Sequence, residues 1–455
     1  METRKMNRRE ILRLMTAGAA GASVLATVSC VAPMETAAPA AEPAMEGFDF
    51  KRFDGESLFI HGENHPISEL VAEIDQEFLE LTGISLEWEL APEAQARQKT
   101  LLYMQGQDTG LDVWETAIPI EKLKFQSEGW YFAINDLLKD PNLSDPDWDA
   151  DDIAAAGWQW VTLDNGDIYA LPSFVPQIIY AFRRDLLEEK GIEPPKTLEE
   201  MEAAADALHD PPNMYGITLR GKAAVWVMWG AFLWNMGGSW QDEDGNLAIA
   251  TPEAIAAAET YVRLLQNYGP PGSTGYDWLE CSSLFSQGQA GMWVDGSDLI
   301  AKSENPENSV IADKIGYSLL PEGPGGQFGP VACVGWAISP FSQKKEASFY
   351  FLQWATNKSN QLRAMISGSP AARVSAWEHP DFAANSLVPQ DWIDTCVESL
   401  KDGVAVPMIP EIIPVNEFGE AVSNALTQAI EGGDVAQLLQ NAQDELEPVM
   451  RASQS

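Results

Sequence analysis

A short stretch in the second half of the chain gathers residue types that could do chemistry. The segment GQAGMWVDGSD, residues 288–298, places Trp293 two residues before Asp295, among small residues and after a run that is typical of a helix. A carboxylate in this setting has four interpretations. It could be a general acid, a metal ligand, an acceptor that holds a hydroxylated molecule, or a polar residue that ends a strand in a turn.

The sequence lacks the patterns that metal-dependent and hydrolytic enzymes use. It contains four histidines, with no HExxH pair and no His/Cys set at zinc spacing. Neither a GxSxG nor a Walker motif occurs, and the glycines of 323–329 lack the spacing of a dinucleotide-binding loop. Carboxylates are so numerous that a glycosidase pair can be drawn at many places, because a sequence gives no distance between them. We therefore predict a binding protein without a catalytic residue, a metal or a cofactor.

Tryptophan is the second chemical signal. Flat aromatic rings stack on the C–H faces of sugars and polyols, while Asp, Asn, Arg and Gln side chains bind the hydroxyls. Five tryptophans lie at positions where the sequence pattern does not require a core residue, and they are candidates for such stacking: Trp114, Trp226, Trp229, Trp293 and Trp336. Each has an alternative as a core residue, and Asp295 has one as a turn or capping residue. His65, which precedes a proline, is interpreted as a loop residue.

Composition limits the partners and the covalent chemistry. The chain has 68 acidic and 28 basic residues, so its net charge of −40 excludes nucleic acid, which is bound through clustered Lys and Arg. Such a charge favours solubility. Besides Cys30, the cysteines are Cys281, Cys333 and Cys396, without CxxC spacing, and we expect buried thiols, although one bridge among them is an alternative.

Residues 1–29 are predicted to be an export signal. Arg8 and Arg9 precede a small-residue apolar stretch that is too short to span a bilayer and that ends at Cys30. The segment 30–50 is rich in Ala, Pro and Glu, which is the composition of a flexible tether. The arrangement resembles a bacterial lipoprotein signal, which implies that Cys30 is lipidated. The paired arginines resemble a twin-arginine signal, so the export route stays open, and a cytoplasmic protein with a frayed start is the alternative.

Strands and helices alternate in the part of the chain after the tether. Residues 57–62, 84–90 and 111–117 are predicted strands, separated by helices at 67–83 and 94–106. This alternation predicts an α/β lobe with a largely parallel sheet. Pro172 and Pro176 interrupt two β-rich pieces, which is typical of a crossover between lobes.

A second α/β unit follows the crossover. Thr197 and Thr251 are predicted helix N-caps, the latter with a proline at the first helical position. The Gly/Pro-rich stretch after 315–320 is a second candidate crossing, and the tail reads as two helices. A chain of this length exceeds what one core normally serves, so two lobes are expected.

The order of several motifs resembles a known family. These motifs are YALP, RRDLLEEKGIEPPKTLEEMEAAADAL, YGITLRG, YGPPGSTGYDWLECSSLFSQGQAGMWVD, DKIGYSLLPEG and FSQKKEASFYFLQWATN. They are similar to the extracellular solute-binding proteins of family 1, the substrate receptors of carbohydrate ABC importers, over nearly the entire mature chain. LRGK, GPPG, GMWVD and the tail IPEIIPVNEFGEAVSNALTQAI are most similar to the branch that binds sorbitol, mannitol and related polyols.

The resemblance implies a two-lobe α/β fold of the type II periplasmic binding proteins. Each lobe would hold a mainly parallel sheet flanked by helices, and a multi-strand hinge would join the lobes. The N-terminal lobe would comprise 51–172 and 322–376. The C-terminal lobe would comprise 173–321 and 377–455.

The resemblance also implies the residues of the ligand site. The first lobe would contribute Asn64 after the first strand, Glu93 and Arg97 at the start of the helix after the second, Trp114 at the end of the third, and Trp336. The second lobe would contribute Arg220, Trp226, Trp229, Trp293 and Asp295, with Asp295 at the cleft lip accepting hydrogen bonds from ligand hydroxyls. The polyol branch carries a glutamate and serines where this chain reads SFVPQII, so Pro176 and Gln177 replace polar contacts, and Gln177 would be the ligand-binding residue of this segment.

These observations predict the substrate-binding lipoprotein of an ABC importer. It would capture a neutral polyhydroxylated molecule, a sugar or a polyol, and deliver it to the permease subunits as a monomer. It would be exported and anchored to the outer face of the cell membrane through Cys30, or be periplasmic. The alternatives are a secreted carbohydrate-active hydrolase, the same receptor fold for an oligosaccharide or a phosphorylated ligand, and a structural lipoprotein or adhesin.

Overall fold

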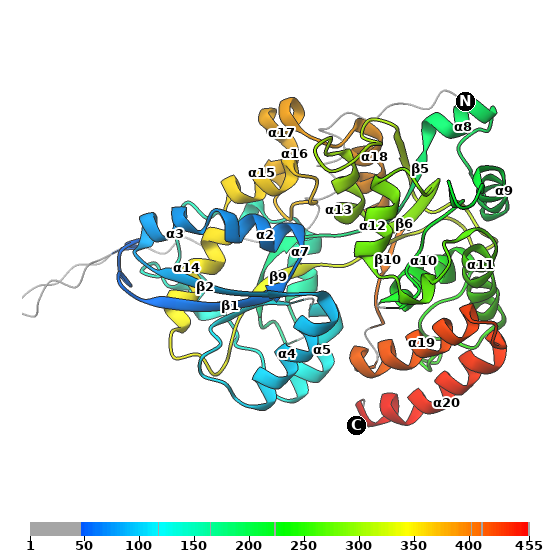
Figure 1. Ribbon diagram of the computed structural model, residues 1–455. Coiled ribbons are helices and arrows are strands. Elements are labelled where there is room, and N and C mark those ends of the chain that lie inside the picture. The colour runs from blue at the N-terminus through cyan, green and yellow to red at the C-terminus, as the bar shows by residue number, and fades with distance from the viewer. Residues whose placement is uncertain are drawn as a thin grey trace, which may run out of the picture.

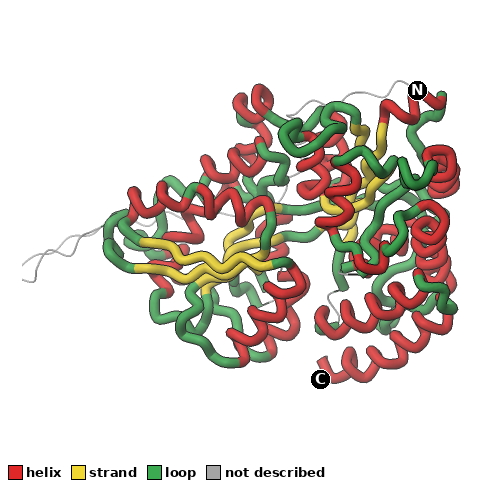
Figure 2. The backbone as a smooth tube through the Cα atoms, viewed as in Figure 1, coloured by secondary structure: helices red, strands yellow, loops and turns green. Residues whose placement is uncertain are grey.

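The computed structural model describes residues 47–453, apart from 117, 164, 223, 402, 411 and 412. The predicted export signal, Cys30 and most of the tether therefore lie outside the described residues. The chain forms two α/β lobes, one in blue, cyan and yellow and the other in green to red (Figure 1). Each has its own group of strands with helices around it (Figure 2).

The first lobe is built on a sheet for which the described residues give the order β2-β1-β3-β9-β4. The strands are β1 (Ser57–Glu63), β2 (Ser85–Ala91), β3 (Val113–Thr116), β4 (Ala170–Phe174) and β9 (Val334–Ile338). β1 pairs in parallel with β2 along its full length and with β3, whereas β9 runs antiparallel to β3 and β4. Leu58 and Ile60 of β1 are fully buried, which anchors this strand in the core.

Helices cover both faces of this sheet. They are α2 (Pro66–Glu73), α3 (Asp75–Thr82), α4 (Glu93–Gln105), α5 (Ile118–Ser127), α6 (Asn135–Lys139), α7 (Ala155–Val161), α14 (Lys345–Ala355) and α15 (Lys358–Ile366), with a short 3-10 turn at Ala150–Asp152. The single helix predicted at 67–83 is divided at Ile74 into α2 and α3. α3 ends as predicted at Gly83, whose φ of 79° is a left-handed conformation that glycine adopts without strain. α2 and α4 begin directly after β1 and β2, so their first turns lie at one edge of the sheet.

The second lobe is built on a sheet with the order β6-β5-β7 among the described residues. The strands are β5 (Ile178–Arg183), β6 (Met292–Gly296) and β7 (Ile315–Ser318). The central β5 runs antiparallel to both neighbours. The expectation of a mainly parallel sheet is therefore wrong for these strands, because β5 enters from the first lobe in the direction opposite to β6 and β7. Isolated parallel bridges join residues 215 and 218 to the β6 side.

Helices also surround the second sheet. They are α8 (Arg184–Lys190), α9 (Leu198–Leu208), α10 (Val225–Asn235), α11 (Pro252–Tyr268), α12 (Trp278–Ser286), α13 (Ser297–Ala301), α16 (Val374–Glu378), α17 (Pro380–Asn385) and α18 (Gln390–Ser399), with 3-10 turns at Ser273–Gly275 and Lys302–Glu304. The predicted N-caps are confirmed, since the hydroxyls of Thr197 and Thr251 accept hydrogen bonds from backbone N–H groups of α9 and α11. The strands β8 (Gly329–Val331) and β10 (Ala405–Pro407) form a small parallel pair, and the tail forms the two expected helices, α19 (Val415–Ile430) and α20 (Val435–Ser453).

The chain passes between the lobes several times. β4 leads into β5 through residues 175–177, and β8 leads into β9 through 332–333. Phe174 forms a bridge with Ala371, so the segment between α15 and α16 runs beside the first crossing. Residues 322–331 contact the second lobe, because Glu322 forms a bridge with Thr197 and β8 pairs with β10. The chain therefore crosses to the first lobe about ten residues after the predicted boundary at residue 321. The other proposed lobe boundaries stay predictions.

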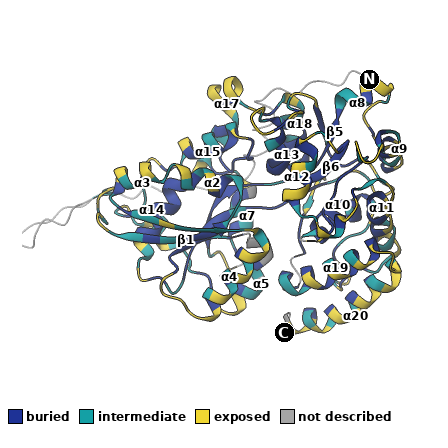
Figure 3. Cartoon of the chain, viewed as in Figure 1, coloured by how far each residue is buried: buried dark blue, intermediate teal, exposed yellow. Residues whose placement is uncertain are grey.

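The two cores follow from this layering. Buried residues, dark blue in Figure 3, gather where helices face the sheets, whereas the outward faces of α4, α17 and α20 carry exposed residues. The three remaining cysteines are free and buried, and burial raises the pKa of Cys333 to about 12. None of the helices in the described part of the chain has both the length and the apolar composition needed to cross a membrane.

Candidate ligand-binding site

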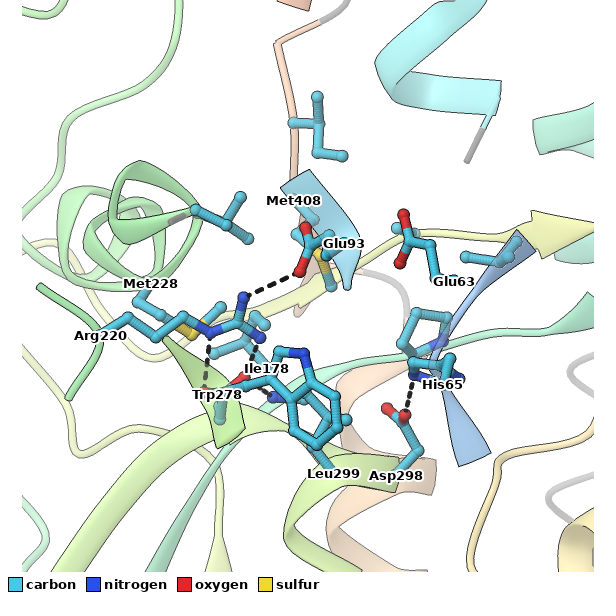
Figure 4. Close-up of a pocket in the computed structure, with 18 of the residues that line it drawn as sticks. Glu63, His65, Glu93, Ile178, Arg220, Met228, Trp278, Asp298, Leu299 and Met408 are labelled. Atoms are coloured by element: carbon cyan, nitrogen blue, oxygen red, sulfur yellow. Dashed lines mark hydrogen bonds and ion pairs between the residues drawn. The ribbon is translucent and has the colours of Figure 1, made fainter. Parts of the chain in front are cut away.

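A cavity of about 110 Å³ lies between the two lobes (Figure 4). Its first-lobe lining is Glu63, His65, Glu93, Arg97 and Glu115, and its second-lobe lining is Arg220, Ala224, Val227, Met228, Trp278, Asp295, Gly296, Asp298, Leu299, Met408 and Ile409. The crossings and the strand ends that flank them add Phe174, Pro176, Ile178, Ala332 and Val334, of which Ile178 begins β5 of the second lobe. The cavity is thus assembled only when both lobes are in place.

Parallel strand pairing positions the first-lobe residues. Glu63 is the last residue of β1, Glu115 lies near the end of β3, and Glu93 opens α4 directly after β2. Because β1, β2 and β3 are parallel, these ends meet at one edge of the sheet, where open α/β sheets bind ligands. Arg97 lies one turn further along α4, on the same helix face as Glu93.

Arg97 links the carboxylates of this edge. Its Nη2 is 3.0 Å from Glu93 Oε1 and its Nε is 3.4 Å from Glu63 Oε1. Burial, opposed by Arg97, raises the pKa of Glu63 to about 8. Burial also raises the pKa of Glu115, whose Oε2 accepts hydrogen bonds from the Ser68 hydroxyl (2.6 Å) and the Glu63 N–H (3.0 Å). This edge therefore holds protonatable carboxyl groups that can both donate and accept hydrogen bonds.

A bidentate ion pair dominates the second-lobe side. Arg220 donates from Nη2 to Asp295 Oδ1 (2.6 Å) and from Nε to Oδ2 (2.9 Å), and both side chains are buried. Asp295 also accepts from the indole N–H of Trp293 (3.2 Å) and the N–H of Gly296 (2.8 Å). Arg220 Nη1 reaches Glu93 Oε2 of the first lobe at 3.4 Å. Burial alone would raise the pKa of Glu93, but the charges of Arg97 and Arg220 outweigh it and lower that pKa.

A second ion pair joins the lobes on the opposite side of the cavity. His65 Nε2 lies 2.7 Å from Asp298 Oδ2, and the imidazole stacks on the ring of Phe174 with centroids 4.7 Å apart. Burial opposes protonation of His65, but the charge of Asp298 outweighs it and raises the pKa. Figure 4 shows this pair and the Arg220 group on either side of Trp278.

Trp278 supplies the large aromatic surface of the cavity. It is the first residue of α12, which is opened by a capping box between Asp277 and Glu280. The Lys302 ammonium lies 4.9 Å from the Trp278 ring centroid, a cation–π contact that holds the ring in place. The ring is therefore fixed before any ligand arrives.

The cavity brings together four of the predicted site residues: Glu93, Arg97, Arg220 and Asp295. Asp295 is not at the cleft lip, because its side chain is fully buried and its oxygens are occupied by Arg220, Trp293 and Gly296. Asn64 lies between two lining residues but does not itself line the cavity. Gln177 is fully buried, and its amide is bound by Val175 O and the Ser297 hydroxyl.

The predicted tryptophans are core residues in this structure, and none of them lines the cavity. Trp114, which is the second residue of β3 and not its last, donates to buried Glu121 at 3.3 Å. Trp226 and Trp229 pack edge-on against Trp240, 6.2 and 5.9 Å away.

The last two tryptophans are equally enclosed. Trp293 packs on Phe285 at 5.8 Å, and Trp336 packs on Phe351 at 5.4 Å. Large aromatic rings stabilise a core through the apolar area that they bury. The sequence pattern does not show which tryptophans have this role.

Several lining residues were missed by the sequence. Glu63 and Glu115 lie, like Glu93, at or just after the carboxyl ends of parallel strands, and this position is a signal that could have identified them. Asp298 lies in the same stretch of sequence as Asp295, and His65, whose position before a proline is typical of a loop residue, also lines the cavity. Trp278, Met408 and Ile409 carry no sequence signal that separates them from core residues.

A model of the bacterial extracellular solute-binding proteins matches residues 63–362, about two thirds of the chain. The chain belongs to this family. Its members are extracellular solute-binding proteins, and the two-lobe fold agrees with this assignment. Within the described residues, no group of three His, Cys, Asp or Glu side chains is arranged to hold a metal ion.

Relatives of this solute-binding protein include polyol receptors. The erythritol/L-threitol-binding protein of Mycolicibacterium smegmatis is 25% identical over 392 residues, 80% of either chain. The mannitol-binding protein of Pseudomonas aeruginosa is 27% identical over 368 residues, 76% of this chain and 82% of its own. A solute-binding protein of Agrobacterium radiobacter K84, solved in complex with ribitol, superimposes with a TM-score of 0.79 at 27% identity and covers 87% of this chain and 99% of its own.

Removal of the Asp295 carboxylate should destabilise the free protein. Asp295→Ala leaves the buried Arg220 charge without its partner, so we expect the free energy of unfolding to fall by about 3–5 kcal/mol. Urea unfolding without ligand measures this. The double variant Arg220→Met, Asp295→Leu removes both charges and should recover much of the loss. Unchanged stability of Asp295→Ala would show that the pair does not support the fold.

Three buried groups predict that the free protein loses stability as pH rises. The pKa is raised to about 8 for Glu63 and about 7 for Glu121, and also for His65, so the folded state holds more protons than the unfolded state. The stability that each group contributes is fully present below its pKa in the unfolded state. It is lost as the pH rises through its higher pKa in the folded state. Unfolding free energy should fall between about pH 5 and 8.

Glu63→Gln removes one of these groups, so the fall with pH should become shallower. Glu188→Gln, an exposed control on α8, should leave the slope unchanged. An equal slope in wild type and Glu63→Gln would contradict the assignment to Glu63. Urea unfolding across the pH range measures both.

Proposed function

We propose that this solute-binding protein is the receptor of an ABC importer for a small, neutral, polyhydroxylated molecule, a sugar alcohol or a small sugar. The observation that carries the proposal is a cavity that both lobes line, with carboxyl groups and arginines facing an aromatic ring. Relatives whose names state erythritol, threitol and mannitol binding, and a similar structure with ribitol, support it.

The chemistry of the lining suits hydroxyl groups. Carboxylates accept hydrogen bonds from hydroxyls, a protonated Glu63 donates to their oxygens, and the guanidinium groups of Arg97 and Arg220 donate as well. Trp278 offers a flat face to the C–H side of a carbon chain or sugar ring. The same groups bind and orient a ligand without any bond being made or broken, so the proposal is binding and not hydrolysis.

Size and charge argue against two alternatives. A buried water needs about 10–15 Å³, so a cavity of about 110 Å³ has room for on the order of ten water-sized groups. This number is close to the count of carbon and oxygen atoms in a four- to six-carbon polyol and is smaller than the count in an oligosaccharide. A phosphate would meet carboxylates, and both arginines are already paired with them.

Closure of the lobes would couple to ligand binding. The contacts Arg220–Glu93 and His65–Asp298 each join one lobe to the other. A ligand that touches residues of both lobes favours the closed state by its differential affinity for that state. The receptor would act as a monomer, and its closed form would be the one that delivers the ligand to the permease subunits.

Cys30 would anchor the receptor to the outer face of the cell membrane after export. If so, Cys30→Ala should release the protein from membranes into the soluble extracellular or periplasmic fraction, as measured by fractionation and by labelling with a fatty acid. Membrane retention of the variant without label incorporation in wild type would refute the anchor.

Ligand titration tests the function directly. The melting temperature of the purified protein should rise with erythritol, ribitol or mannitol and not with maltose, because a ligand of the native state at 100 times its Kd adds about 2.7 kcal/mol. Trp278→Ala should weaken binding by about 1–3 kcal/mol through lost apolar contact. Trp158→Ala, outside the cavity lining, should leave the Kd unchanged. No response to any polyol or monosaccharide would refute the proposal.

A further inference from the structure

The second-lobe side of the cavity is largely apolar. Its surface is formed by an apolar wall, which we define as Ile178, Val227, Met228, Leu299, Met408 and Ile409. All six side chains line the cavity, and their exposures of 1% to 7% show that the rest of their surface packs in the cores of the protein. Methionine sulfur is a weak acceptor and the other side chains have no polar atom. The wall therefore offers almost nothing to a hydroxyl group.

The charged residues of this side compensate for the wall only in part, because most of their hydrogen bonds are made within the protein. Arg220 directs Nε and Nη2 to Asp295 and Nη1 toward Glu93. Asp298 is engaged by His65 at 2.7 Å. The side chain of Gln177, at the position where polar contacts were expected, is turned away and held by Val175 and Ser297. On this side, the hydrogen-bonding capacity left for a ligand is thus limited to the remaining N–H groups of Arg220 and one oxygen of Asp298. The first lobe offers a larger set, namely Glu63, Glu93, Arg97 and Glu115.

This distribution conflicts with a ligand that carries a hydroxyl on every carbon. A linear alditol presents hydroxyls in several directions, and those that face the apolar wall would be buried without a partner. An unpaired buried hydroxyl costs about 1–3 kcal/mol. Figure 4 shows Met228 and Ile178 beside Arg220, with Glu63 on the other side of the cavity, so the apolar wall adjoins the Arg220 group and lies across from Glu63 of the first lobe.

We infer that the preferred ligand is a deoxy polyol or deoxy sugar, with hydroxyls along one part and a methyl or methylene end. The inference rests on the proposed function and specifies its substrate class. The hydroxylated part contacts the carboxyl groups and arginine of the first lobe, and the deoxygenated end packs against Met228, Met408 and Ile178. Apolar burial then replaces hydroxyl groups that this wall cannot satisfy.

Matched pairs of probes test the inference. Calorimetric titration of the purified protein compares ribitol with each enantiomer of terminal-deoxy ribitol, and galactitol with L- and D-fucitol, its terminal-deoxy forms. We expect at least one deoxy form to bind about fivefold or more tightly than its parent, as the cost of one unpaired hydroxyl predicts. Parents that bind as tightly as both deoxy forms, or more tightly, overturn the inference and leave the proposed function standing. If no polyol or sugar binds at all, both fall.

Variants of the wall identify its role. Met228→Gln introduces a hydrogen-bonding amide of similar size and should reduce or reverse the preference for the deoxy form, whereas Met228→Leu keeps an apolar surface and should retain the preference whatever its effect on affinity. Met408→Gln is the second variant, because Met408 comes from a different segment. Melting curves establish that each variant folds. A deoxy preference that both glutamine variants leave unchanged would show that the wall does not set it.

Discussion

Arg220 carries a permanent charge into the interior of the protein, and the arrangement of the site follows from how that charge is compensated. A guanidinium cannot be deprotonated, so its neighbours must supply the compensation. Asp295 does so with two hydrogen bonds, and Trp293 and Gly296 fix the carboxylate from behind. The Tyr261 hydroxyl holds the backbone carbonyl of Arg220 at 2.6 Å. One guanidinium nitrogen is left to face the first lobe, and it meets Glu93 there.

The shortage of cations shapes the rest of the cavity. The chain carries 28 basic against 68 acidic residues, and the cavity repeats this imbalance, with five carboxyl groups around Arg97, Arg220 and His65. Where a cation is near, as at Glu93, the carboxyl group is held ionised; where burial dominates, as at Glu63, the proton is retained. The result is a surface that is rich in acceptors and has a few fixed donors, and this is the requirement for recognising uncharged hydroxyl groups.

The sequence predicted the architecture better than the site. Alternating strands and helices, the caps at Thr197 and Thr251 and the family motifs led to the two-lobe fold, because these signals are local. The direction of β5 was not predictable, since pairing depends on how the crossing enters the second lobe. Glu93 and Arg97 were identified through the family resemblance, and the structure places them at a strand-to-helix junction. The prediction that five tryptophans bind the ligand was wrong, because a sequence does not show whether an aromatic residue faces a cavity or packs on a sheet. Trp278 differs from Trp336 only in what surrounds it.

Two side chains of the cavity, Met408 and Ile409, come from the connection that follows β10. This connection leads to α19, and its backbone is tied to β8 through the hydrogen bond from Met408 N–H to Val331 O. Neither residue belongs to a strand of the two sheets that carry the charged groups, but both side chains also pack in the core of the second lobe, so their replacements must be apolar and of similar volume. Descendants of this chain could therefore exchange them, and with them the shape of molecule that is accepted, while every strand pairing is inherited unchanged. Under the proposed function, the contacts to hydroxyl groups would then be inherited with the sheets, while the shape of the accepted ligand would vary with this connection.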